Sequence, residues 1–118
     1  MQDLGQDITV EQRMLDAMAL RARVALHNLA NQDTPGFKRS EVRFEEHLAT
    51  AMRRGEGAAS ARLEVVRDDS GTPGQNNVEA MDELKTLFEA RLLQDLFARR
   101  VKNHFDRLRM AVGGGSGA

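Results

Sequence analysis

The fold is decided by the stretch Asn28-Leu29-Ala30-Asn31-Gln32-Asp33-Thr34-Pro35-Gly36-Phe37-Lys38, where a helical pattern stops. Pro35 fixes its own φ and disfavours helical geometry at Thr34, and Gly36 can adopt the positive φ that the third position of a type II turn requires. The helix is therefore expected to end near Asn31, a residue that tolerates the left-handed conformation of a C-terminal cap. Local physics alone predicts a turn that redirects the chain.

A helix is predicted before this turn, from about Ile8 to Asn31. Its apolar residues recur at steps of three and four, which places them on one face of a helix. Two small residues on that face would allow another helix to approach closely. The predicted packing residues are Leu15, Met18, Ala22, Ala25 and Leu29.

A second long helix is predicted near the other end of the chain. Asn76 or Asn77 caps it, Val78 opens it, and no Pro or Gly interrupts it before about Val112. Acidic residues lie early and basic residues late, which complements the helix dipole. The apolar rows drift around the helix, as expected when one helix contacts different neighbours along its length. The predicted packing residues are Leu84, Phe88, Leu92, Leu96, Val101 and Phe105.

The segment between the helices, residues 38–76, is polar and is expected to be flexible. Within it, short extended pieces are predicted near Val42 and Val65, and a brief amphipathic helix is predicted to end before Gly55. Residues 55–61 are small and are interpreted as a linker. The fold class is thus mainly α. The chain divides into an N-terminal helix and turn (1–37), the middle segment (38–76) and a C-terminal helix with a Gly-rich flexible tail (77–118), which together form one domain.

Composition limits the function. The 118 residues are 41% hydrophobic and 30% charged, with a net charge of -1, which argues against a nucleic-acid binder that works by bulk positive charge. The absence of Cys excludes disulfides and thiolate metal sites. No run approaches the roughly 20 apolar residues of a membrane span, and residues 1–7 lack the features of a cleaved secretory signal.

No catalytic, cofactor-binding or metal site is predicted. His27 and His47 are interpreted as surface residues, because no second His or acid lies at the spacing of metal ligands. Asp68 and Asp69 supply only a fragment of a calcium loop. The basic end of the second helix is interrupted by Asp106 and offers no free aromatic ring to stack on bases. An enzyme is therefore not expected.

The motif around the turn resembles the N-terminal signature of the flagellar rod, hook and filament-junction family of axial proteins. The order Asn, apolar, Ala, Asn, Thr-Pro-Gly, aromatic, Lys carries the resemblance. The run Asn76-Asn77-Val78 before the second helix strengthens it, and a short chain of this kind is most similar to the proximal-rod members of the family. The assembly motif consists of Asn28, Asn31, Thr34, Pro35, Gly36 and Phe37.

Two helices joined by a polar segment bury little surface by themselves, so further partners are expected to be other chains. The resemblance implies that the terminal helices pair as an antiparallel coiled coil and that many copies pack helically into a drive shaft around an export channel. It also implies export through the flagellar type III apparatus, without a cleaved signal peptide, into the periplasmic rod of the basal body. The implied partners are other copies, the rod proteins FlgC, FlgF and FlgG, the adaptor FliE, and proteins of the export gate and MS ring.

Two alternatives remain open from the sequence. The chain could be the related rod protein FlgC, or it could be a soluble helical interaction module such as a flagellar export chaperone or regulator. A module of the second kind would be stably folded in isolation, whereas a rod subunit alone is expected to melt with weak cooperativity.

Overall fold

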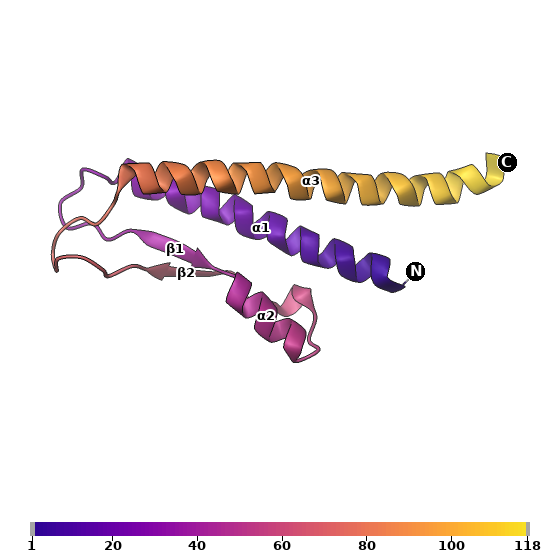
Figure 1. Ribbon diagram of the computed structural model, residues 1–118, viewed down its shortest axis with the longest axis horizontal. Coiled ribbons are helices and arrows are strands. Elements are labelled where there is room, and N and C mark those ends of the chain that lie inside the picture. The colour runs from indigo at the N-terminus through magenta and orange to yellow at the C-terminus, as the bar shows by residue number, and fades with distance from the viewer. Residues whose placement is uncertain (1, 118) are drawn as a thin grey trace.

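The computed structural model describes residues 2–117, with side chains described for residues 9–113. The elements are α1 (Gln2–Ala30), β1 (Ser40–Arg43), α2 (Glu45–Arg53), the short 3-10 helix η1 (Ala58–Ser60), β2 (Glu64–Arg67) and α3 (Ala80–Gly117). The fold is mainly helical, as predicted, and elongated, with extents of 67 × 30 × 13 Å (Figure 1). In this part of the chain no helix contains a segment of the length and apolar character that crossing a membrane requires.

The two long helices lie side by side and run in opposite directions (Figure 1). Their bounds differ from the prediction: α1 begins at Gln2 rather than near Ile8, and α3 begins at Ala80 and continues through the Gly-rich tail to Gly117. The reason is that apolar periodicity marks the buried part of a helix, whereas the backbone hydrogen bonds continue beyond it. The tail that was expected to be flexible is thus helical as far as Gly117.

A thin core lies between α1, α3 and the start of the middle segment. On α1, Met18, Ala22 and Ala25 are buried as predicted, and Leu15 and Leu29 are half-buried. Most of the core residues are alanines, with a few large side chains among them. Because alanine is small, the neighbouring elements can approach one another closely. The buried cluster contains Ala17, Met18, Ala22, Phe44, Ala51, Ala61 and Ala90.

On α3, the face toward the core differs from the predicted packing row. Glu83 and Ala90 are buried and Leu87 packs against the core, whereas Phe88 and Leu92 are 69% and 71% exposed. Glu83, Leu87 and Ala90 recur at helical spacing, as Leu84, Phe88 and Leu92 do, and nothing local decides which of these two rows meets the core. The other predicted packing residues on α3 are half-buried (Leu84, Val101) or exposed (Leu96, Phe105). A packing role for the exposed residues stays a prediction about contacts with other chains.

The middle segment contains regular structure. β1 pairs antiparallel with β2, with Ser40 opposite Arg67 and Arg43 opposite Glu64, and α2 confirms the brief helix. The two strands lie close to the extended pieces predicted from sequence.

Residues 55–61 do not behave as a flexible linker. Ala58 and Ala61 are buried, η1 lies in contact with α1, and Arg13 donates a hydrogen bond from Nη2 to the carbonyl of Ala61 at 2.5 Å. The small side chains that suggested a linker instead allow close packing. His47 was interpreted as solvated, but it is half-buried and hydrogen-bonds Glu64 at 2.9 Å, which ties α2 to β2.

Candidate assembly site

The turn after α1 has the predicted geometry. The amide of Phe37 donates to the carbonyl of Thr34 at 3.2 Å, and Gly36 between them has a φ of 75°. A positive φ at the third position defines a type II turn, and glycine adopts it without the steric cost that a Cβ brings. The prediction of a turn at residues 34–37 is therefore confirmed, and the chain leaves it toward β1.

Asn28 is fully buried and joins three elements. Its Nδ2 donates to the carbonyl of Ser40 at 2.8 Å and to Oε2 of Glu83 at 3.1 Å, while its Oδ1 accepts from the amide of Ser40 at 3.0 Å. An amide side chain has the two donors and the acceptor that this position uses. The residue thus fixes the end of α1 to the first residue of β1 and to the first turns of α3.

Asn76 closes the end of α1. Its Nδ2 donates to the carbonyls of Asn31 and Thr34, both at 2.8 Å, and its Oδ1 accepts from the amide of Val78. Asn31 completes this corner, because its Nδ2 donates to the carbonyl of His27 and its Oδ1 accepts from the hydroxyl of Thr34. The assembly motif and the Asn-Asn-Val run, far apart in sequence, therefore meet in space.

Asn77 connects β1 to the loop after β2. Its Oδ1 accepts from the amide of Arg39 at 2.7 Å, and its Nδ2 donates to the carbonyls of Asp68 and Ser70. The prediction that Asn76 or Asn77 caps α3 is wrong. The helix begins only at Ala80. Asn76 bonds the amide of Val78 and the end of α1, and Asn77 bonds Arg39 and the loop after β2, so neither side chain caps α3.

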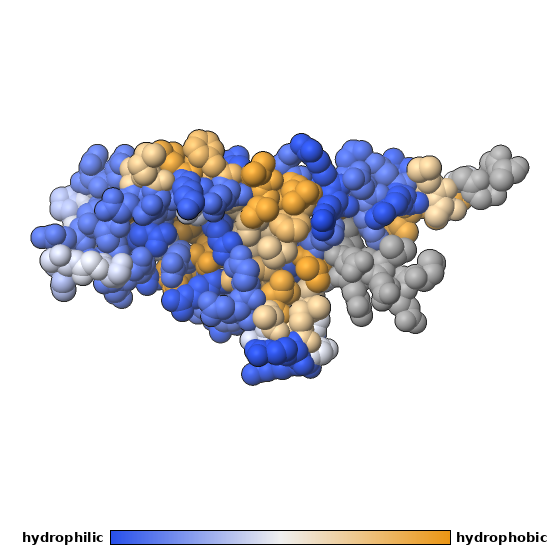
Figure 2. Space-filling view, in the orientation of Figure 1, coloured by the Kyte–Doolittle hydropathy of each residue, from blue (hydrophilic) through white to orange (hydrophobic). Residues whose placement is uncertain are grey.

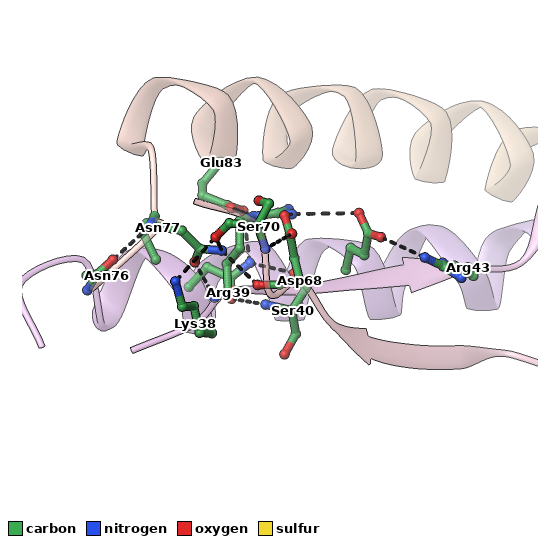
Figure 3. A network of polar contacts seen from close by, with 12 residues as sticks. Lys38, Arg39, Ser40, Arg43, Asp68, Ser70, Asn76, Asn77 and Glu83 are labelled. Atoms are coloured by element: carbon green, nitrogen blue, oxygen red, sulfur yellow. Dashed lines mark hydrogen bonds and ion pairs between the residues drawn. The ribbon is translucent and has the colours of Figure 1, made fainter. Parts of the chain in front are cut away.

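A buried carboxylate lies at the centre of these contacts (Figure 3). The side chain of Glu83 is 1% exposed, and its Oε1 accepts from Nε of Arg39 at 2.5 Å. Arg39 also donates from Nη1 to Oδ2 of Asp68 at 2.9 Å. Burial of a charge is tolerated only when it is paired and hydrogen-bonded, and Glu83 meets this condition through Arg39 and Asn28. We call this set the polar clamp: Asn28, Arg39, Asp68, Asn76, Asn77 and Glu83.

Asp68 gives the polar clamp a dependence on pH. The hydrogen bond from the Ser70 amide, then the Ser70 side chain and Arg39, lower the pKa of Asp68 from 3.8 to about 2. A lowered pKa in the folded state means that the stabilisation is complete above the unfolded value and is lost as pH falls through about 2.

Asp68→Asn is therefore expected to be less stable than the parent chain near neutral pH, and the difference should shrink as pH falls from about 4 to about 2. Urea unfolding at a series of pH values measures it. Asp69→Asn is the matched control, because Asp69 is exposed and, among residues 9–113, its one ion pair is with the surface residue Arg67. Equal pH profiles for the two variants would refute the role of Asp68.

The assembly motif divides into an inner and an outer part. Asn28 is buried and Asn31 and Phe37 are half-buried, whereas Thr34, Pro35 and Gly36 are exposed. The ring of Phe37 lies edge-on to that of His27, with centroids 5.7 Å apart, and His27 is exposed as predicted. The exposed turn, Thr34 to Gly36, is predicted to contact neighbouring subunits, in keeping with the resemblance to axial proteins.

Sequence reasoning missed the central residue of the polar clamp. The acidic residues at the start of α3 were predicted only to complement the helix dipole, but Glu83 lies four residues before Leu87 and seven before Ala90, on the row that faces the core. An acidic residue in an otherwise apolar row of a helix was the feature of the sequence that could have indicated a buried carboxylate. Its partner Arg39 had no such signal, because its position depends on the turn and on β1. Over the described part of the chain, no group of three or more His, Cys, Asp or Glu is placed to hold a metal ion.

Comparison with known proteins gives consistent relatives. The flagellar basal body rod protein FlgB of Borreliella burgdorferi is 30% identical over 108 residues, which cover 92% of this chain and 69% of that protein. FlgB of Borrelia hermsii is 27% identical over 89% of this chain and 94% of its own length. FlgB of Escherichia coli is 31% identical over 72 residues, which cover 61% of this chain. No family model matches the chain.

The helical fold and these relatives define the class: a structural subunit of the bacterial flagellar basal-body rod. More particularly, the chain belongs to the family of FlgB flagellar basal body rod proteins.

Proposed function

We propose that this chain assembles in the proximal rod by head-to-tail packing with copies of itself and with other axial proteins, forming part of a drive shaft around an export channel. The proposed neighbours are the rod proteins FlgC, FlgF and FlgG, the adaptor FliE, and proteins of the MS ring and export gate. The proposed route to the rod is the flagellar type III apparatus, without cleavage of a signal peptide. Family membership and the sequence motif support these assignments.

A row of exposed apolar side chains on α3 carries the proposal. Met81, Phe88 and Leu92 are 77%, 69% and 71% exposed, and Leu96 follows one turn later at 44%. At helical spacing these residues share one side of α3, opposite the side that carries Glu83, Leu87 and Ala90. Apolar side chains are visible at the surface of the region that α3 occupies (Figure 2). Such a row commonly marks a protein interaction surface.

The proposed contact is heterologous. The exposed row on α3 of one copy would pack against a different surface of the next copy. Contacts of this heterologous kind continue into open helical filaments when the rotation does not close. The antiparallel coiled coil belongs to the same proposal: α1 and α3 lie in contact along the chain, and regular interdigitation would stiffen them in the assembled rod.

Leu92→Asp is expected to abolish rod assembly while leaving the isolated fold intact. Leu92 is exposed, so the charge costs the monomer little, whereas an unpaired charge in an apolar contact costs several kcal/mol. Soft-agar motility and electron microscopy of basal bodies measure the outcome. Glu89→Lys is the control: it reverses the charge of an exposed side chain beside the row and leaves every apolar side chain of the row in place. Equal effects would mean that the row is not the interface.

Mass spectrometry of purified hook–basal bodies tests the assignment itself. The chain is expected in the detergent-resistant rod fraction of its native cell. Its recovery only in a soluble complex of small, fixed stoichiometry would instead support an export chaperone or regulator.

A further inference from the structure

The two edges of the small sheet differ. In the pairing of β1 with β2, the amide of Asp68 donates to the carbonyl of Arg39 at 2.8 Å, so residues 39 and 68 form a hydrogen-bonded pair. Along an antiparallel ladder, hydrogen-bonded pairs alternate with pairs that form no hydrogen bonds to each other. The next hydrogen-bonded pairs are therefore Glu41 with Val66 and Arg43 with Glu64. The backbone groups of the residues between them point away from the partner strand.

The outer edge of β1 is closed by side chains of α1. Asn28 satisfies both the amide and the carbonyl of Ser40, and Nη2 of Arg21 donates to the carbonyl of Val42 at 3.0 Å. Arg21 is held in place by Glu45, whose two carboxylate oxygens each lie 2.8 Å from its guanidinium nitrogens. This edge cannot accept another strand.

The outer edge of β2 is open. Val65 and Arg67 direct their amides and carbonyls away from β1, and within residues 9–113 these groups have no hydrogen-bond partner. Val65 is also 50% exposed. β2 lies on the side of β1 that faces away from α1, so no helix covers this edge (Figure 1). An uncovered strand edge is a template for pairing with another chain.

We propose that the open edge of β2 binds β2 of a second copy of this chain, antiparallel and with Val65 opposite Val65 of that copy. Each Val65 would donate its amide to the carbonyl of the other. Val42 lies opposite Val65 within each sheet, so the four valines would form one continuous apolar row across four strands. Arg62 of each copy would lie opposite Asp68 of the other.

The charges of the strand select this register. Only registers that place outward-facing residues opposite one another can form hydrogen bonds. If the β2–β2 pairing were centred on Val66, Glu64 would lie opposite Asp68. If it were centred on Arg67, the two copies of Arg67 would lie opposite each other. Both shifted registers therefore place like charges opposite one another. Of these three registers, the one centred on Val65 pairs opposite charges, Arg62 with Asp68. Arg62 is exposed, and within residues 9–113 its one ion pair is with Glu64, two positions on, so its side chain can turn toward another chain.

The proposed β2–β2 dimer is a different contact from those proposed for the rod. A two-fold contact closes on itself, whereas a filament needs contacts that continue. The inference therefore concerns chains outside the filament, and it rests on the sheet geometry rather than on the role of α3.

Amide hydrogen exchange by NMR, with sedimentation velocity, tests the proposal in the full chain carrying Leu92→Asp, which removes association through the exposed row of α3. As the concentration rises from about 10 μM to about 1 mM, exchange of the Val65 and Arg67 amides should slow at least tenfold and a dimer should appear. A peptide of residues 61–69 should protect the same two amides, and a scrambled peptide should not.

Val65→Pro removes the outward amide, and Val65→Thr retains it as the matched control. The dimer should vanish only in Val65→Pro, while protection of the Glu64 and Val66 amides reports that the β1–β2 ladder is intact. A monomer at every concentration would overturn the proposal, as would a dimer that persists in Val65→Pro with an intact ladder. Neither result bears on rod assembly, which motility measures separately.

Discussion

Glu83→Ala is expected to lower the free energy of unfolding by about 3–5 kcal/mol, because it breaks a buried ion pair from one side. The guanidinium of Arg39 and the amide of Asn28 would lose their shared acceptor at a site where Glu83 is 1% exposed. Arg39 would keep its bond to Asp68 and Asn28 its bonds to Ser40, but each would lose one hydrogen bond that compensates for burial. Urea unfolding at neutral pH, with helix content followed by circular dichroism, measures the loss.

Asp82→Ala is the matched control for this change. Asp82 is the adjacent acid in the first turn of α3 and is exposed, so its replacement removes the same favourable interaction with the helix dipole without opening the polar clamp. Glu83→Gln should fall between the two variants, because it retains the shape but loses the charge. Equal losses for Glu83→Ala and Asp82→Ala would show that the polar clamp adds nothing to stability.

Gly36→Val is expected to cost about 1–3 kcal/mol and to abolish motility. The cost comes from the φ of 75°, which a β-branched residue adopts only under strain. A Cβ at this position would lie 3.6 Å from the carbonyl of Gly74, an ordinary contact, so crowding is not the cause. If the turn relaxes, the carbonyl of Thr34 moves away from Asn76 and the corner that joins α1 to α3 opens.

Gly55→Val separates backbone strain from the role of the turn. Gly55 has a φ of 69° and open space where a Cβ would lie, so a similar loss of stability is expected there. It lies at the end of α2, away from the polar clamp, and motility should be retained. Soft-agar assays together with denaturant unfolding of both variants decide the matter. Loss of motility in both variants would mean that stability alone, rather than the direction of the chain after α1, limits assembly.

The polar clamp gives these predictions a common basis. It holds the end of α1, the start of β1, the loop after β2 and the start of α3 at one point. The exposed turn at residues 34–36 and the exposed row on α3 are therefore held in a fixed relation to each other. For a subunit that packs head to tail, this relation would set the angle between one copy and the next.

Local patterns in the sequence determined where the elements lie. Pro35 and Gly36 fix the turn through their own φ preferences, α2 follows from a short apolar period, and the small residues of α1 mark its buried face. These features depend only on neighbouring residues, so they could be read without the fold.

The contacts between residues far apart in the sequence were decided only by the tertiary structure. The sequence predicted that Asn76 or Asn77 caps the helix, because asparagine commonly caps helices. Instead, Asn76 bonds the backbone of Asn31 and Asn77 bonds the backbone of Arg39, and both partners lie more than thirty residues away. α3 carries two apolar rows, and the choice between them was made by Glu83, which requires the guanidinium of Arg39 and the amide of Asn28 together. A buried charge needs partners at fixed positions, and the folding of the whole chain is what brings such distant partners together.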